Sequence, residues 1–335
     1  MHVEPPNALA LQSTRRRFLM GTALAALAGQ SLASEDGGFP RKPVRLVVPY
    51  PPGGGADNVA RLLAPQLASA WKVPVVIDNK PGASGMIGND AVAKAMPDGH
   101  TVLLGIAALA QMPSLYSRLP YDVMRDLVPL SEIALTADLL MVSASLPARS
   151  VRELADLVRA NGQPMEYGSY GNATSSHMHG EQLRRVAGVD LLHVPYAGAG
   201  PEMAALLDGQ VRTAFVEYTA ANPHLASPKL RVLATTGTRR HPALPSVPTL
   251  GEQGFSGFEA NGWFGAFVPA GTPASIVRKL SEDIAQAARS PEVAGRLSAM
   301  GLVPTGTDAD SLRARLERDL PHWSSIVKGA GIRLD

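Results

Sequence analysis

The amino-acid sequence predicts an α/β protein with two lobes, each an open sheet covered by helices, joined by a two-stranded hinge. Two observations predict this fold class. Short β-branched apolar runs alternate along the chain with longer amphipathic stretches, the usual pattern of open α/β sheets. The 335 residues also exceed the usual size of one domain. A single sheet of eight or more strands is an alternative, but two smaller sheets agree better with usual domain sizes.

The first 33 residues resemble an export signal. Arg15, Arg16 and Arg17 precede an apolar stretch of about 11 residues at 18–28, and small residues at 31–33 supply a cleavage site. That stretch is shorter than the roughly 20 residues that cross a bilayer. Paired arginines followed by Phe-Leu favour the twin-arginine route over the general one. We therefore expect an exported protein that loses residues 1–33.

The mature chain is expected to fold into two lobes with the following elements. Strands are predicted at 44–48, 75–77, 102–106, 139–142, 165–168, 191–194, 213–216 and 230–234. Helices are predicted at 57–71 (with a kink at Pro65), 87–95, 151–159, 176–186, 201–207, 274–288 and 311–328. Such alternation predicts mostly parallel sheets. Crossings near 137–143 and 260–267 would place residues 34–138 and 266–335 in lobe 1 and 139–265 in lobe 2.

Composition excludes several classes of function. The chain has no cysteine, which excludes disulfides, thiolate metal sites and cysteine nucleophiles. Net charge is +2, aromatic residues make up 5%, and Lys and Arg form no long run, so we expect no nucleic-acid partner. Loss of the leader would remove three arginines and one glutamate, leaving equal numbers of acidic and basic residues.

The most informative segment is Tyr-Pro-Pro-Gly-Gly-Gly-Ala-Asp at 50–57, between a predicted strand and a predicted helix. Glycines let the backbone approach a ligand, and the amides at a helix start attract a carboxylate or phosphate. Asp57 is placed to cap the helix. A tight turn without any ligand is the alternative. Nucleotide motifs are absent: Asn58 stands where a dinucleotide loop needs its last glycine, and no Gly-Lys-Ser/Thr follows.

Two further glycine-rich segments have the same position between a strand and a helix. They are residues 79–88 and residues 167–177, the second in the other proposed lobe. In open α/β sheets, ligands bind beyond the carboxyl ends of strands. Loops on two lobes that face one cleft would hold a small anion from both sides.

Enzymatic interpretations find little support in the sequence. Ser169 lacks the Gly-x-Ser-x-Gly elbow. His177 and His179 are two residues apart and would point to different sides of a helix, although His177 and Glu181 could share a metal. His193 is interpreted as a strand residue held by a hydrogen bond. We expect no catalysis, no cofactor and no metal, and keep a secreted hydrolase that uses Ser169 or a His177–Glu181 metal site as an alternative.

Several strings in a fixed order carry a family resemblance. They lie at 50–57, 78–85, 97–100, 193–198, 207–211, 245–252, 263–265 and 269–273. With these strings the chain resembles the periplasmic solute receptors of tripartite tricarboxylate transporters, also called Bug proteins. The resemblance spans nearly all of the mature chain.

The resemblance implies two Rossmann-like lobes of the type II periplasmic-binding-protein kind, which close on a small carboxylate. The ligand would be a di- or tricarboxylate, an aromatic acid or an acidic amino acid. Implied partners are the membrane permease subunits of a tripartite transporter, and the receptor would be a monomer. A periplasmic sensor that feeds a signalling kinase is the alternative.

The ligand-binding residues follow from the glycine loops and from the resemblance. They are Tyr50, Gly53, Gly54, Gly55, Asp57, Ser84, Ile106, Ala107, Ala108, Ser169, Gly171, Asn172, Ser175, Ser176, His177 and Tyr196. Two positions depart from the family pattern. Residues 106–108 lack the usual hydroxyl, which favours an aromatic or aliphatic acid, and Arg212 replaces an acidic residue, which we interpret as a surface change.

Overall fold

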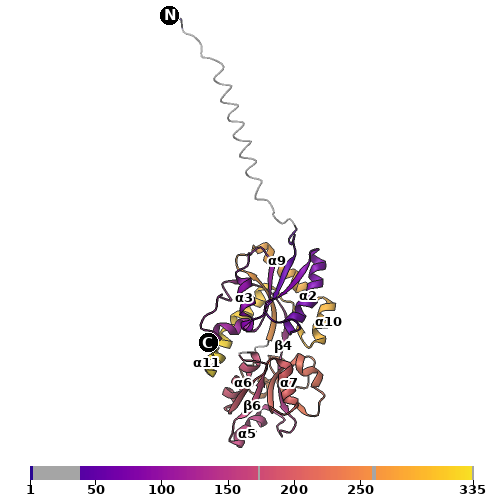
Figure 1. Cartoon of the computed structure of the whole chain (residues 1–335), viewed down its shortest axis with the longest axis vertical. Coiled ribbons are helices and arrows are strands. Elements are labelled where there is room, and N and C mark those ends of the chain that lie inside the picture. The colour runs from indigo at the N-terminus through magenta and orange to yellow at the C-terminus, as the bar shows by residue number, and fades with distance from the viewer. Residues whose placement is uncertain (3–37, 173, 259–261, 334–335) are drawn as a thin grey trace. The chain divides into compact units, whose positions relative to one another are not determined.

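The computed structural model describes residues 1–2, 38–172, 174–258 and 262–333 (Figure 1). The chain divides into two units, Met1–Phe39 and Pro40–Asp335, and every element below belongs to the second. Apart from residues 1 and 2, the predicted export signal and its cleavage site lie outside the described residues. None of the described helices combines the length and the apolar character that a membrane span requires.

Six strands form the first sheet, in the order β11-β4-β10-β3-β1-β2. The strands are β1 (Val44–Val48), β2 (Val75–Asn79), β3 (Thr101–Ile106), β4 (Leu127–Thr136), β10 (Gly262–Pro269) and β11 (Val303–Pro304). Its helices are α2 (Gly55–Trp71), η1 (Ala83–Gly85), α3 (Met86–Ala93), α4 (Ala108–Leu115), α9 (Ala274–Arg289), α10 (Pro291–Ala299) and α11 (Ala309–Ala330). Helix α9 packs on β4 and α2, and α11 packs on α4 and β4.

Five strands form the second sheet, in the order β7-β6-β8-β5-β9. The strands are β5 (Asp138–Ser143), β6 (Met165–Ser169), β7 (Leu191–Pro195), β8 (Thr213–Glu217) and β9 (Leu230–Thr235). Its helices are α5 (Val151–Asn161), α6 (Ser175–Ala187), α7 (Ala199–Leu207), α8 (Tyr218–Ala221), η2 (Asn222–His224) and η3 (Gly251–Gln253). Helices α5, α6 and α7 lie around this sheet in Figure 1.

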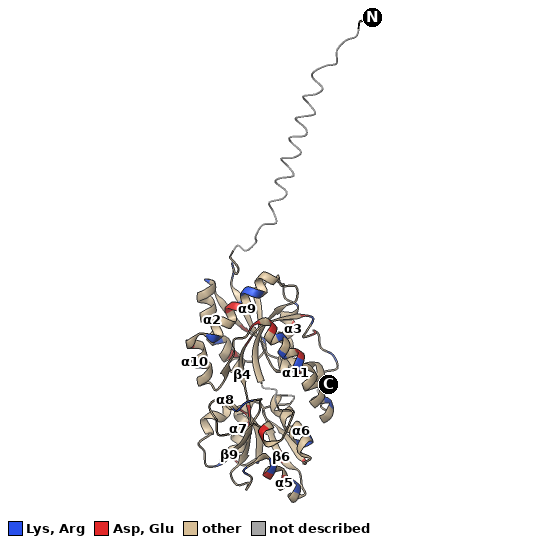
Figure 2. Ribbon diagram, turned by 180° about the vertical axis from the view of Figure 1, so that it is seen from behind, with Lys and Arg blue, Asp and Glu red and all other residues tan. Residues whose placement is uncertain are grey.

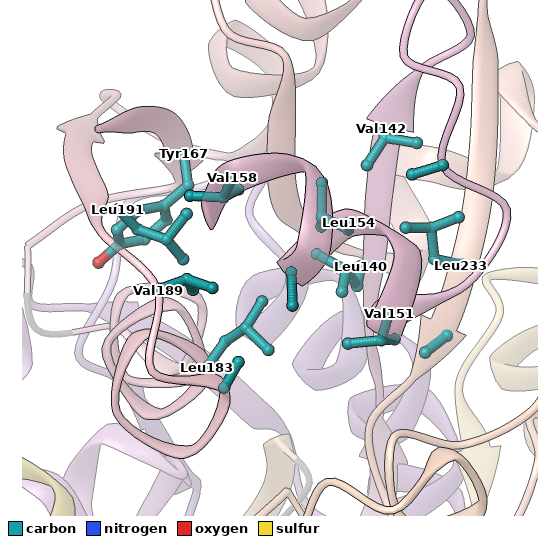
Figure 3. Packing of buried hydrophobic residues seen from close by; sticks show 14 of the residues in the cluster. Leu140, Val142, Val151, Leu154, Val158, Tyr167, Leu183, Val189, Leu191 and Leu233 are labelled. Carbon is teal, nitrogen blue, oxygen red and sulfur yellow. The ribbon is translucent and has the colours of Figure 1, made fainter. Parts of the chain in front are cut away.

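Helix α5 shows how local sequence and packing agree. The Ser150 hydroxyl accepts the Glu153 amide at 3.1 Å and caps the helix start. Apolar residues at helical spacing, Val151, Leu154 and Val158, are buried against the sheet (Figure 3). Burial of one such side chain contributes about 1.5–3 kcal/mol, so this face fixes the helix on the second sheet.

The expectation of mostly parallel sheets is wrong. In the first sheet β1 pairs parallel with β2 and β3, but β10 pairs antiparallel with β3 and β4, and β11 with β4. In the second sheet β6 is parallel to β7 and β8, and β5 is antiparallel to β8 and β9. The antiparallel strands include β4, β5 and β10, which bound the two predicted crossings. An antiparallel pair does not need the helical crossover that connects two parallel strands.

Strand β4 was not expected at all, and β10 was expected only as a crossing. Pro129, Ser131 and Glu132 interrupt the apolar pattern of β4, and its pairing with β10 contains register shifts. Helices α4, α8 and α10 were also missed. The chain changes sheet at Ala137, between β4 and β5. The second crossing includes residues 259–261, outside the described residues, and the predicted boundary at 265/266 falls inside β10.

Charged residues of both signs are interspersed along the helices of both sheets (Figure 2). Arg212, interpreted from the sequence as a surface change, forms a half-exposed ion pair with Glu166 at 3.7 Å. Such pairs contribute little stability, in agreement with a surface role.

Candidate functional site

The glycine loop before α2 presents backbone amides to solvent. Gly53, Gly54 and Gly55 are exposed, and Gly53 has a φ of 85°, which favours glycine. The amides of Gly55 and Ala56, at the first two positions of α2, have no partner within the helix. They lie at the positive end of the helix dipole. This end of α2 is therefore suited to an anionic group.

Asp57 holds this loop in place. Its carboxylate accepts the Gly53 amide at 2.8 Å, Arg61 at 2.8 and 3.1 Å, and Asn79 Nδ2 at 3.0 Å. These hydrogen bonds, first that of Arg61, outweigh burial and lower the pKa of Asp57 to about 2. The predicted cap needs correction, because the N-cap is Gly54 and Asp57 lies in the first turn. Asp57 also occupies the Gly53 amide, which is thereby withheld from a ligand.

The loop at 82–85 lies beside Tyr50. The Tyr50 hydroxyl donates to the Ser84 carbonyl at 3.2 Å, and Asn79 Nδ2 donates to the Tyr50 carbonyl at 3.1 Å. Ser84 is exposed, has a φ of 55° and follows Gly82 and Ala83, which also have positive φ values. A Cβ atom at Gly85 would lie 2.9 Å from the Tyr50 hydroxyl. The structure thus brings together Tyr50 and Ser84, two of the predicted site residues.

Residues 106–108 join the end of β3 to the start of α4. Ile106 pairs with Phe264 in β10, and a Cβ atom at Gly55 would lie 3.3 Å from the Phe264 ring. The Ala107 amide donates to the Trp263 carbonyl at 3.1 Å, so it is engaged in the fold. Phe264, which sequence reasoning did not select, thus connects the α2 loop with the end of β3.

The loop before α6 is the counterpart on the second sheet. Thr174 is its N-cap and accepts the His177 amide at 3.5 Å. Ser175 and Ser176 occupy the first two helical positions and are buried, whereas Asn172 is exposed. The Tyr196 amide donates to the Ser169 carbonyl at 2.9 Å. Gln111 of α4 donates through Nε2 to the Ser175 hydroxyl at 3.0 Å, which links the first sheet with the start of α6.

Ser169, His193 and His177 form a stacked group beneath this loop. Ser169 Oγ lies 2.6 Å from His193 Nε2, and the His193 ring stacks on the His177 ring with centroids 3.8 Å apart. Burial, and secondarily His193, lowers the pKa of His177 to about 3, and burial also lowers the pKa of His193. The expected hydrogen bond of His193 is confirmed. His177 is buried in the stack and does not lie at the loop surface.

The Ser169–His193 contact resembles a nucleophile with its base. However, the Ser169 side chain is fully buried, and its hydroxyl also hydrogen-bonds with the Gly171 carbonyl at 3.1 Å and the Gly171 amide at 3.3 Å. A hydroxyl engaged by its own loop supports that loop. The geometry therefore favours a structural role for this pair.

The His177–Glu181 metal site finds no support. Glu181 accepts the Tyr167 hydroxyl at 2.8 Å and Arg184 Nε at 2.9 Å. Across the described ranges, no group of three or more His, Cys, Asp or Glu side chains has the arrangement of a metal site.

Sequence reasoning missed a group of carboxyls at the same edge of the second sheet. Asp138 accepts the Tyr170 hydroxyl at 3.2 Å and lies 2.9 Å from His179 Nδ1. Burial, and then Asp138, raises the pKa of Glu217 to about 7 and that of Glu202 to about 9. A signal was present, because Asp138 immediately precedes one predicted apolar strand, at 139–142, and Glu217 immediately follows another, at 213–216.

The predicted site residues therefore fall into three groups. Exposed or half-buried positions around the two helix starts and β3 are Tyr50, Gly53, Gly54, Gly55, Ser84, Ile106, Ala108, Gly171, Asn172 and Tyr196. Buried positions that support the loops are Asp57, Ala107, Ser169, Ser176 and His177. Ser175 is buried and contacts α4 of the first sheet.

Comparisons with known proteins agree with this architecture. The sequence profile of the "Tripartite tricarboxylate transporter family receptor" matches residues 59–332. A UPF0065 protein in the tcbD-tcbE intergenic region of Pseudomonas sp. strain P51 is 36% identical over 93% of this chain and 94% of its own. Protein BugT of Bordetella pertussis is 32% identical over 97% of this chain and its whole length.

Two solved structures from Rhodopseudomonas palustris have the same fold. Rpa4515 with adipate has a TM-score of 0.77 and 33% identity and covers 88% of this chain and all of its own. MatC with bound malate has a TM-score of 0.72 and 31% identity and covers 86% of this chain and all of its own. These neighbours confirm the predicted two-lobe α/β fold of the type II periplasmic-binding-protein kind.

Proposed function

Because the chain belongs to the tripartite tricarboxylate transporter receptor family, we propose that it closes its two lobes in the periplasm on a small carboxylate for uptake through such a transporter. Membrane permease subunits would be its partners. Export by the twin-arginine route and a monomeric receptor belong to the same proposal. Adipate and malate in similar structures support a carboxylate ligand.

One observation carries the proposal: each sheet ends a parallel strand in a small-residue loop that opens a helix. These helices are α2 after β1 and α6 after β6, and the first amides of each have no partner within the helix. The α2 loop is exposed, as a primary carboxylate site requires. Helix starts bind carboxylates without a basic side chain.

Contacts between elements of the two sheets would stabilise the closed form. Gln111 Nε2 donates to Ser175 Oγ, and the ring centroids of His179 in α6 and Trp323 in α11 are 5.6 Å apart. Met178 of α6 belongs to the same core cluster as Trp323. A ligand shifts the lobes toward closure only as far as it binds the closed form more tightly. Trp323 fluorescence is therefore a suitable reporter of closure.

The ligand class is tested by thermal unfolding with a panel of carboxylates, adipate and malate included, and neutral sugars as controls. At about 100 times its Kd, a ligand adds roughly 2.7 kcal/mol, which raises Tm by a few degrees. If sugars raise Tm and no carboxylate does, the proposal is wrong. Ile106 and Ala108, both half-buried, favour an aliphatic or aromatic far end.

The Gly54→Val variant tests the α2 loop. A Cβ atom at Gly54 would contact only the Pro51 carbonyl, at 3.6 Å, and its φ of −77° suits any residue, so the fold should persist. The added side chain should obstruct the amides and weaken carboxylate binding at least tenfold, measured by calorimetry. Gly295→Val is the matched control, because Gly295 lies in open space on α10. Equal affinity in a folded Gly54→Val protein would remove this loop from the site.

Uptake and signalling to a kinase begin with the same closed receptor. Accumulation of a radiolabelled carboxylate separates them: cells that lack the receptor should lose uptake. Unchanged uptake with loss of a ligand-induced transcriptional response would favour signalling.

A further inference from the structure

Three carboxyl groups lie at the edge of the second sheet that carries the α6 loop. Asp138 begins β5 opposite Glu217, which ends β8. Glu202 lies in the first turn of α7, and the Ser176 hydroxyl donates to its Oε1 at 3.4 Å. Tyr170 follows β6, and its pKa is raised first by burial and then by the charges of all three carboxyl groups. One small region therefore gathers three acidic side chains.

These three carboxyl groups differ in their hydrogen-bond partners. Asp138 has the Tyr170 hydroxyl and His179 Nδ1 as partners. Glu217 accepts the Thr136 hydroxyl at 3.3 Å and a hydrogen bond from Thr219, while Glu202 has the Ser176 hydroxyl. Among the described residues, the charged groups that act on Glu202 are Asp138 and Glu217, both acidic. In the part of the chain that the structure describes, no cation therefore acts on Glu202 or Glu217.

Two further buried oxygens belong to this region. Oε2 of Glu202 and Oε1 of Gln111 have no hydrogen-bond partner among the described residues, and both side chains are 0% exposed. Buried polar atoms are nearly always hydrogen-bonded. Gln111 belongs to α4 of the first sheet, and its amide contacts Ser175, which hydrogen-bonds to Tyr170. Acceptors from both sheets therefore converge on the same region.

This region lies close to the α2 loop. Glu217 bonds to Thr136, and Thr136 pairs with Gly262 of β10. Phe264, two residues further and on the same face of the strand, has its ring beside Gly55. Two residues of a strand span about 7 Å. A path of contacts thus runs from Gly55 through Phe264 and Thr136 to Glu217.

We propose that the ligand carries a cationic nitrogen in addition to its carboxylate, with the carboxylate at the start of α2 and the nitrogen facing Glu217. This inference rests on the proposed function. A simple dianion would place its second charge beside Glu217 and Asp138, where like charges repel. A nitrogen cation supplies the donor and the charge that these carboxyls lack. Glu217 is then the residue that determines specificity.

Calorimetry at pH 7.5 with matched pairs tests this inference. The pairs are adipate with 6-aminohexanoate, and succinate with aspartate. The nitrogen-bearing member should bind at least tenfold more tightly in at least one pair. Glu217→Gln should reduce that preference to within about threefold and raise the affinity for the dicarboxylate, because it removes a like charge. Glu166→Gln, at the exposed ion pair on β6, is the control and should keep the preference.

Each result has a defined consequence. Equal or tighter binding of both dicarboxylates by the natural protein overturns the inference and leaves the carboxylate receptor intact. An undiminished preference in a folded Glu217→Gln protein, with folding checked by circular dichroism, also overturns it. If no member of either pair binds and no other carboxylate stabilises the protein, the receptor proposal fails and this inference with it.

Discussion

The loops before α2 and α6 have equivalent places on their sheets and are held in opposite ways. The α2 loop is exposed, and an ionised Asp57 holds it through Gly53, Arg61 and Asn79. The α6 loop lies between buried serines, Ser169 before it and Ser175 and Ser176 after it, and it is supported by neutral stacked histidines. The difference suggests a division of labour. Under the proposed function, the first loop would attract an anion through its free amides, and the second would discriminate among ligands through the acidic side chains beside it.

The largest expected effect comes from removing the Asp57 carboxylate, whose hydrogen bonds hold the α2 loop. Asp57→Ala should lower the free energy of unfolding by about 3 kcal/mol, because it breaks a buried charged network. Urea unfolding at pH 7 measures it. Arg61→Ala is the control and should cost below about 1 kcal/mol, because Arg61 is half exposed. Similar losses in both variants would show that the ion pair alone holds the loop.

The hydrogen bonds of Asp57 also predict that the free energy of unfolding depends on pH. The pKa of Asp57 is lowered in the folded protein, so its stabilisation is present above about pH 4 and is lost as pH falls toward 2. The natural protein and Asp57→Ala should therefore converge in stability at acid pH. Parallel stability curves from pH 7 to pH 2.5 would contradict this account.

Next in size is the histidine stack of the α6 loop. Because the folded pKa of His177 is about 3 and the ordinary value is about 6.5, its stabilisation is present above pH 6.5 and is lost as pH falls toward 3. His177→Phe keeps a ring and removes the titration, so it should be more stable than the natural protein at pH 4.5 by roughly 2 kcal/mol. Tm measured between pH 7.5 and 4.5 tests this. If His177→Phe is no more stable than the natural protein at pH 4.5, the histidine stack is open to water.

The smallest effect concerns the helix caps. Thr174→Ala should cost about 0.5–1 kcal/mol, because it removes the bond to the His177 amide. Gly54→Ala at the other helix start removes no side-chain bond and should change stability less. Urea midpoints compare the two variants. A larger loss in Gly54→Ala would reverse the comparison between the loops.

Local sequence predicted the parts of the fold that local physics controls. The runs that became β1 and β3 are mostly apolar and bounded by turn residues, and the α2 loop is a row of glycines between a strand and a helix. Strand β4 could not be found in this way, because Pro129, Ser131 and Glu132 hide its pattern and its partner β10 lies more than a hundred residues away. Pairing across such a distance is decided by the fold as a whole.

The candidate site shows the same limit. Glycine and serine at the two helix starts were readable, because a backbone that approaches a ligand needs small residues there. The cluster of three acidic side chains could not be predicted. Asp138, Glu202 and Glu217 come from β5, α7 and β8, and strand register brings them close together. His177 lies in the predicted helix, but its burial in a stack with His193 could not be predicted, because that stack depends on β7.

The sequence by itself determined the α/β class and the two small-residue loops at helix starts, because periodicity and glycine spacing act within one segment, and its ordered strings carried the family resemblance. Only the tertiary structure decided the mixed sheets, the polar clamp at Asp57 and the acidic edge beside the second loop. Those features depend on groups far apart in the chain, whose charge and burial take effect when folding brings them within a few ångströms of one another.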